Sequence, residues 1–195
     1  MTFRSGHPIE LDARARSRRS RASPHGVVRL IWLATLLLLA PTAGADAATE
    51  YRLKAAFIYN FANFSHWPAA SAGKLRVCVY GRSPILRALE PIAGRISNGR
   101  QIEILQRAQD ATVEGCEVVF VTESAIARLP ALLAEIGDEP VLTVANSPGA
   151  GRTGAAFNMV VVEDKVRFEV NLPATRRGGL RVDPRVLRLA TAVHQ

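Results

Sequence analysis

The sequence has few of the residues from which catalytic and metal sites are usually built. Its 195 residues include two cysteines and four histidines, and only His66 and His194 lie beyond residue 45. No C-x-x-C, H-E-x-x-H or G-x-S-x-G motif is present, and no carboxylate pair stands out by its spacing. Such patterns are typical of zinc sites, metalloproteases and hydrolases. The sequence therefore predicts no catalytic residue, no metal ligand and no cofactor, and we expect a protein that is not an enzyme.

The sequence also lacks an apolar run of the length that an ordinary membrane-spanning helix needs, about 20 residues. The run at residues 30–40 is 11 residues long. It follows seven arginines and precedes Ala43 and Ala45, which have the spacing of a signal-peptide cleavage site. We therefore predict a cleavable signal peptide over residues 1–45 and export of the chain. An uncleaved anchor is the alternative, and a translation start near Val27 would give the signal peptide an ordinary length.

Positive charge is not concentrated in the part of the chain that remains after this cleavage. The whole chain has a formal net charge of +8, of which +5 comes from the first 45 residues, with seven arginines against Glu10 and Asp12. The remaining 150 residues carry +3, spread over many positions. Nucleic-acid binding usually needs a concentrated basic surface, so we expect no nucleic-acid partner. The length of this part matches one typical domain, over residues 46–195.

Hydrophobic spacing beyond residue 48 predicts helices that alternate with strands. An aromatic face that includes Phe61 and Phe64 predicts a helix that begins after Thr49 and ends at Trp67, because Pro68 disfavours helical geometry in the residue before it. Strands separated by helices favour a mainly parallel sheet covered on both faces, which is a three-layer α/β fold. We expect strands at residues 75–81, 101–105, 116–121 and 140–144, and helices at 83–89 and 124–136, the latter stopped by Gly137.

The C-terminal part has a different pattern. Residues 159–162 and 166–170 are strand-like and flank a polar Glu163-Asp164 turn, which predicts a hairpin. Asp183, followed by Pro184 at the first helical position, predicts a final helix that continues through Ala190.

Residues 149–154 match the dinucleotide fingerprint G-x-G-x-x-G letter for letter. That fingerprint needs a strand before the glycines and a helix after them, whereas residues 155–162 lead into a predicted strand. We therefore expect a mobile loop here and no bound dinucleotide. Together with Asn146, Asn158 and Asn171, this loop is a candidate site for a small ligand or a cell-wall fragment.

Cys78 and Cys116 would meet an oxidising compartment after export, where paired cysteines are commonly bridged. If the sheet places its first strand between its second and third, the strands that carry these residues are neighbours about 4.8 Å apart. A disulfide is then possible where the register brings the two residues level. Two independent buried thiols are the alternative. The role of a bridge would be structural or, less commonly, redox-sensing.

Blocks of sequence spread over residues 51–192 form a pattern that goes beyond these local signals. The first block is YRLKAAFIYNFANF, closed by Trp67-Pro68, and the last runs from Val166 to Asn171, with Gly179-Leu180 and Ala190 after it. Residues 76–81, 115–121 and 140–144 form the blocks between them. Together the blocks resemble the YfiR-like family of exported bacterial proteins.

The resemblance implies a Rossmann-like domain in the periplasm. It also implies a regulator that represses an inner-membrane diguanylate cyclase through the periplasmic sensor domain of that enzyme, and that is sequestered by an outer-membrane lipoprotein. Family members commonly have cysteines at the positions of Cys78 and Cys116, which supports their pairing. The sequence departs from the family at Asp183-Pro184-Arg185, where small hydroxyl residues usually precede the final helix.

We therefore predict a non-enzymatic periplasmic regulator that lowers cyclic di-GMP signalling and biofilm formation by binding a membrane-embedded signalling protein. The alternative is a small-ligand or cell-wall-fragment binding module that acts on another membrane receptor or kinase. The oligomeric state stays open, with a homodimer as one arrangement. The candidate residues for contact with a partner or ligand are Asn60, Trp67, Arg152, Asn158, Asn171, Arg176 and Arg177.

Overall fold

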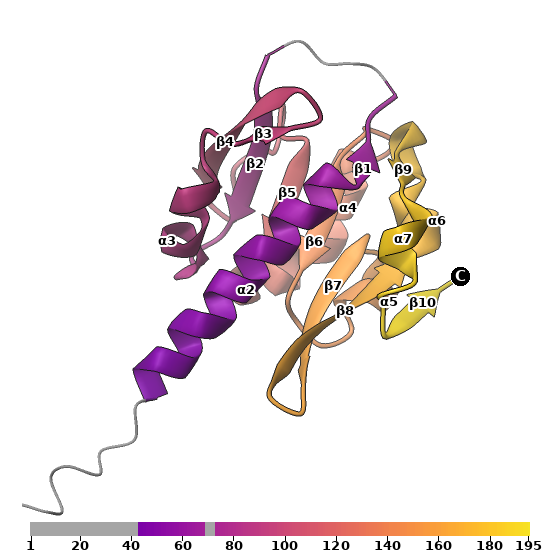
Figure 1. The fold of residues 1–195 in the computed structure, drawn as a ribbon. Coiled ribbons are helices and arrows are strands. Elements are labelled where there is room, and N and C mark those ends of the chain that lie inside the picture. The colour runs from indigo at the N-terminus through magenta and orange to yellow at the C-terminus, as the bar shows by residue number, and fades with distance from the viewer. Residues whose placement is uncertain (1–42, 69–72) are drawn as a thin grey trace, which may run out of the picture. The chain divides into compact units, whose positions relative to one another are not determined.

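The computed structural model describes residues 43–68 and 73–195 (Figure 1). Residues 43–195 form one compact unit. The predicted signal peptide lies outside the described residues except for its last three, which begin the first helix, and it stays a prediction. Among the helices that the structure describes, none combines the length and the apolar character needed to cross a bilayer.

An eight-stranded, mainly parallel sheet forms the centre of this unit (Figure 1). Five neighbouring strands pair in parallel, in the spatial order β4 (Arg100–Arg107), β2 (Leu75–Tyr80), β5 (Val118–Val121), β6 (Leu142–Ala145) and β7 (Phe157–Val162). The first strand of the sheet, β2, therefore lies between the second and the third, which is the order that makes the cysteine-bearing segments neighbours. Every residue of β5 and β6 is buried, as in parallel strands that are covered on both faces. The predicted α/β class with a mainly parallel sheet is therefore confirmed.

Shorter or antiparallel strands complete both edges of the sheet. β8 (Lys165–Asn171) pairs antiparallel with β7, and β10 (Ala192–His194) pairs in parallel with β8. At the other edge, β3 (Ile96–Ser97) pairs antiparallel with β4. The turn between β7 and β8 places Glu163 and Asp164 at φ values of 49° and 57°, as a two-residue hairpin turn requires. The predicted hairpin is confirmed.

One face of the sheet is covered by α2 (Ala43–Asn63) and α3 (Ile85–Leu89). Phe61 of α2 stacks on Phe157 of β7 with ring centroids 4.0 Å apart, and it contacts Phe168 of β8 edge-on at 5.1 Å. Such aromatic contacts stabilise a core beyond the burial of their area. The aromatic face of the first helix thus packs against the β7–β8 end of the sheet.

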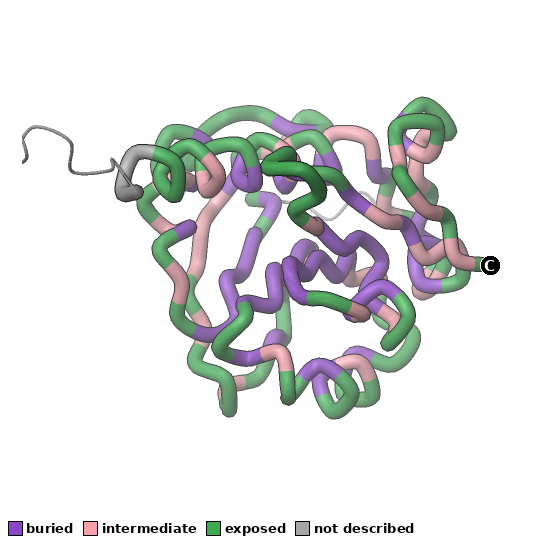
Figure 2. Tube along the Cα trace, turned by 90° about the horizontal axis from the view of Figure 1, so that it is seen from below, coloured by how far each residue is buried: buried purple, intermediate pink, exposed green. Residues whose placement is uncertain are grey.

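The opposite face is covered by a 3₁₀ segment, η3 (Glu123–Arg128), and by α4 (Leu129–Ile136), with the short α5 (Ala150–Thr153) beside it. A second core lies between these elements and the sheet, and Figure 2 shows the buried segments concentrated in the interior of the trace. Gly137, at φ 54°, ends α4 as predicted. The structure therefore has the three predicted layers, and α5 replaces the loop that was expected at residues 149–154.

The predicted bounds of the first helix were wrong at both ends, because α2 begins at Ala43, before Thr49, and ends before Trp67. α2 ends at Asn63, and the next residues form β1 (Ser65–His66), which pairs antiparallel with β9 (Arg181–Val182). The side-chain amide of Asn98 donates to the carbonyl oxygens of Ala62 at 2.9 Å and Ser65 at 3.0 Å. It thus provides a hydrogen-bond donor for a carbonyl group at the end of the helix. A capping group that comes from a distant turn leaves no local signal in the sequence.

The C-terminal segments fold against this end of α2. They are α6 (Leu172–Thr175), η4 (Arg177–Gly179), β9 and α7 (Pro184–Leu187). Elsewhere in the chain, the 3₁₀ turn η2 (Glu90–Ile92) follows α3. Asp183 caps α7 as predicted, with its carboxylate accepting from the amide of Arg185 at 2.8 Å. The prediction that this helix continues through Ala190 was wrong, because the chain turns so that the amide of Thr191 can bond to Phe168 at 2.9 Å.

Candidate functional site

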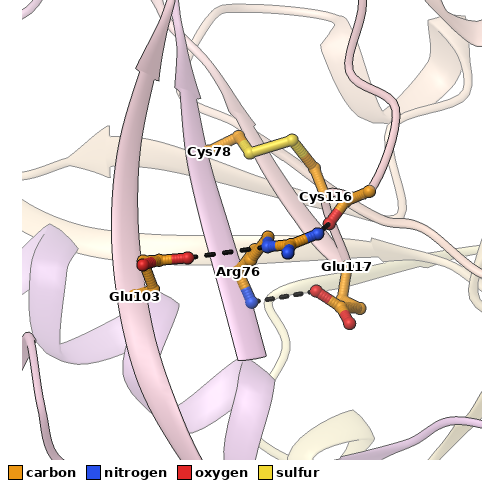
Figure 3. The surroundings of a disulfide bond; sticks show 6 residues. Arg76, Cys78, Glu103, Cys116 and Glu117 are labelled. Atoms are coloured by element: carbon orange, nitrogen blue, oxygen red, sulfur yellow. Dashed lines mark hydrogen bonds and ion pairs between the residues drawn. A yellow bond between two sulfur atoms is a disulfide. The ribbon is translucent and has the colours of Figure 1, made fainter. Parts of the chain in front are cut away.

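Cys78 and Cys116 form a disulfide on the face of the sheet that α4 covers (Figure 3). Their Cα atoms are 5.9 Å apart, and both residues are buried. The predicted strand at residues 116–121 begins only at Val118, because Cys116 lies in a turn that its amide closes onto Val113 at 3.0 Å. The bridge therefore joins the middle of β2 to the turn before β5, and the two cysteines are not level in the ladder.

Charged side chains surround the bridge at the amino ends of β2, β4 and β5 (Figure 3). Glu117 accepts from the amide of Arg76 at 2.9 Å and pairs with Arg100, and this ion pair is mostly buried. Glu103 pairs with Lys74 at 2.8 Å and with Arg76 at 3.5 Å. The hydrogen bond from Lys74 is the main cause that holds the pKa of Glu103 below its usual range. Each of these carboxylates joins neighbouring segments, which stabilises this end of the sheet.

A glycine allows this packing beside the bridge. Gly115 has a φ of 74°, which L side chains rarely adopt, and its carbonyl oxygen accepts from the guanidinium of Arg76 at 3.4 Å. A Cβ atom at this position would lie 2.8 Å from Nη1 of Arg76. The turn before β5 therefore requires glycine here.

An acidic groove of about 640 Å³ lies next to the bridge. Its walls include the apolar side chains of Val113, Ile136 and Val141 together with Trp67, whose buried indole Nε1 has no hydrogen-bond partner among the described residues. Arg76 is the one basic residue in the lining. The carboxylates that give the groove its charge are Glu114, Glu117, Glu135 and Glu139, which the sequence did not single out because they are scattered along the chain.

A second groove, of about 490 Å³, is formed by the C-terminal segments. Leu172, Leu180 and Leu187 provide apolar surface, and the exposed Arg176 and Arg181 provide positive charge. Its remaining lining residues are His66, Thr175, Val182, Asp183 and Pro184. Asp183 pairs with Arg185 at 2.7 Å, and the hydrogen bonds from Arg185 lower the pKa of Asp183 to about 2.

The structure brings three of the candidate ligand residues together around α5. Asn158 is fully buried, where its Oδ1 accepts from the amide of Ser147 at 3.2 Å. Asn171 caps α6 and donates to the carbonyl oxygen of Gly151 at 2.8 Å, while the neighbouring Arg152 is exposed. The two asparagine side chains therefore already have partners within the protein.

The other candidates lie elsewhere. Asn60 is exposed on α2, and Trp67 lies just after β1. Arg176 and Arg177 lie at η4, whose Gly179 is near Pro68, since a Cβ atom at Gly179 would lie 3.4 Å from Cβ of Pro68. Trp67, Arg176 and Arg177 thus form a second group near the β1–β9 pair.

One polar contact was not anticipated from the sequence. His194 of β10 lies 3.4 Å from Glu169 of β8, and Glu169 also accepts from Asn158 at 3.4 Å. Only the pairing of β10 with β8 brings His194 to this position, so no local motif could indicate it. Within residues 43–68 and 73–195, no three histidine, cysteine or acidic side chains are placed to hold a metal ion.

Comparison with known proteins identifies the family. The structure is similar to the crystal structure of a conserved domain protein from Vibrio cholerae O1 biovar El Tor str. N16961, with a TM-score of 0.54 and 11% sequence identity. The match covers 73% of this chain and 60% of the Vibrio chain, and at this identity it concerns the fold alone. A family model described as YfiR/HmsC-like matches residues 51–191, which contain both cysteines and both grooves. The chain belongs to the YfiR/HmsC-like family.

Proposed function

We propose that this protein is a non-enzymatic periplasmic regulator that represses an inner-membrane diguanylate cyclase and so lowers cyclic di-GMP signalling. The family match over residues 51–191 is the observation that carries the proposal. Repression would come from binding to the periplasmic sensor domain of the cyclase. Sequestration of the protein by an outer-membrane lipoprotein would relieve the repression.

Export is the first requirement of this function. The 11-residue apolar run and the alanines at positions 43 and 45 support cleavage before Asp46. An oxidising periplasm would also allow the Cys78–Cys116 bridge to form. N-terminal sequencing of the protein from a periplasmic extract should give a first residue at or near Asp46. A full-length chain that stays in the membrane fraction would contradict the proposal.

The groove of the C-terminal segments is the best candidate for the partner surface. It combines apolar side chains with Arg176 and Arg181, which are exposed and have no acidic partner among the described residues. An interface with this character suits a partner segment that has apolar residues and carboxylates. Arg177 follows Arg176 of the groove directly in the chain, and Trp67 follows His66, which also lines the groove.

Measurement of cyclic di-GMP in cells tests the proposal. Deletion of the gene should raise the cyclic di-GMP level and biofilm formation, and the wild-type gene should restore both. The double variant Arg176→Glu/Arg181→Glu should fail to restore them, because reversed charges would repel an acidic partner. Arg87→Glu, on α3 and outside the groove, is the matched control and should behave as wild type. An unchanged cyclic di-GMP level in the deletion strain would refute a cyclase partner.

A binding measurement with purified proteins separates direct repression from an indirect effect. The exported protein should bind the isolated periplasmic domain of the cyclase. The charge-reversed variant should bind it more weakly, and high salt should change the association of this variant little. Light scattering during the same experiment would show whether one copy or a homodimer binds. Binding of a cell-wall fragment in place of the cyclase domain would favour the alternative function.

A further inference from the structure

A cavity of about 720 Å³ lies at the carboxyl ends of β2 and β4, away from the bridge and from both grooves. It is lined by residues 81–82 after β2, residues 106–110 at the end of β4, and Ser124 of η3. The chain leaves β2 toward β4 on one side and returns to β5 on the other. Ligands of open parallel sheets usually bind where the strand order reverses in this way.

Hydrogen bonds and a close glycine contact fix the walls of this cavity. Gly81 has a φ of 100°, and a Cβ atom there would lie 2.3 Å from Oγ1 of Thr122. Oγ of Ser124 accepts from the amide of Arg82 at 2.9 Å. The hydroxyl of the buried Tyr80 donates to the carbonyl oxygen of Gln109, which fixes the loop after β4. A site whose walls are held in this way loses little freedom when a ligand binds.

Two arginines in the lining have no acidic partner. Arg82 is exposed and Arg107 is half-buried, and neither forms an ion pair with any residue that the structure describes. Nε of Arg107 is buried without a hydrogen-bond acceptor in the described part of the chain. A buried donor without an acceptor is unfavourable. Asp110 is the one carboxylate in the lining, so the lining carries a net positive charge.

We propose that this cavity binds a small organic anion, with Arg82 and Arg107 holding its carboxylate or phosphate group. Guanidinium groups present several N–H donors in a planar fork that matches both kinds of anion. The side-chain amide of Gln106 also lines the cavity and provides a further polar contact for the ligand. This site does not depend on the regulatory function proposed above.

Calorimetric titration of the exported chain tests the site. The probes are inorganic phosphate and citrate, which distinguish a phosphate preference from a carboxylate preference. We expect saturable binding of at least one probe, and a loss of affinity of about tenfold or more in Arg107→Gln and in Arg82→Gln. Arg87→Gln removes the same charge outside the cavity and should change the affinity by less than about twofold.

NMR spectroscopy shows whether the probe binds in this cavity or elsewhere on the protein. In NMR spectra of the labelled protein, the amide of Gly81 and the Nε–H of Arg107 should shift with the same saturation curve as the heat. Arg107→Lys should keep part of the affinity, because the charge remains while the fork is lost. If Arg107→Gln does not fold, the affinity of Arg82→Gln, a variant at an exposed position, tests the proposal. The absence of binding to both probes, or an equal loss in Arg87→Gln, would overturn the proposal.

Discussion

Loss of the Cys78–Cys116 bridge should lower the stability of the protein by a predictable amount. The bridge closes a segment of 38 residues. In the chain-entropy model, a loop of this length contributes about 4 kcal/mol, because the bridge restricts the unfolded chain. With a denaturant slope of about 2 kcal/mol per molar, this corresponds to a fall of about 2 M in the urea midpoint. The bridged protein, the reduced protein and Cys78→Ala/Cys116→Ala should be unfolded in parallel and followed by circular dichroism.

The comparison of the three forms separates two causes. The reduced wild-type protein lacks only the cross-link, whereas the double alanine variant also lacks two buried sulfur atoms and should be the least stable. The slope should rise when the bridge is lost, since the unfolded chain then exposes more surface. A loss of less than about 1 kcal/mol in the reduced protein would refute the loop-closure reasoning.

Three further predictions concern single residues. Phe61→Ala should lower the free energy of unfolding by about 3 to 5 kcal/mol in urea titrations, because it removes a stacked ring from the core. Gly81→Ala should be poorly tolerated and show a lowered melting temperature, because its Cβ would collide with Thr122. Asp183 has a folded pKa of about 2, below its ordinary value of 3.8, so its stabilising effect should be complete above about pH 4 and lost as the pH falls toward 2. In Arg185→Gln, NMR titration should find that pKa raised but still below 3.8, because the backbone amide of residue 185 still donates to Asp183. An unchanged value would contradict the side chain of Arg185 as the main cause.

The parts of the fold that depend on local spacing were predictable from the sequence. The buried strands β2, β5 and β6 are short apolar runs, and the hairpin turn has the polar pair Glu163-Asp164. The strand order was only assumed from flavodoxin-like folds, and the structure has that order and the Cys78–Cys116 bridge. These elements were found because each one is specified by residues that are close in sequence.

The ends of elements were less predictable, because distant residues determine them. α2 ends where Asn98 caps it, 35 residues beyond its last residue, Asn63. The final helix stops after four residues because β10 must reach the edge of β8. The residues of the anion cavity were also not predicted, because they are distant from one another in the sequence. Arg82, Arg107 and Ser124 share a cavity only because three strands bring their ends together.

The two ends of the sheet use arginine in different ways, and this difference indicates which end provides stability and which provides binding. At the amino end, Arg76 and Arg100 each have a carboxylate partner next to the bridge. At the carboxyl end, Arg82 and Arg107 have none among the described residues, although Arg107 is half-buried. Because β2 has six residues, its ends are about 17 Å apart, a separation at which the effects of substitutions usually add. Nε of Arg107 is buried without an acceptor in the described part of the chain, which is unfavourable for folding, and a bound anion would supply that acceptor.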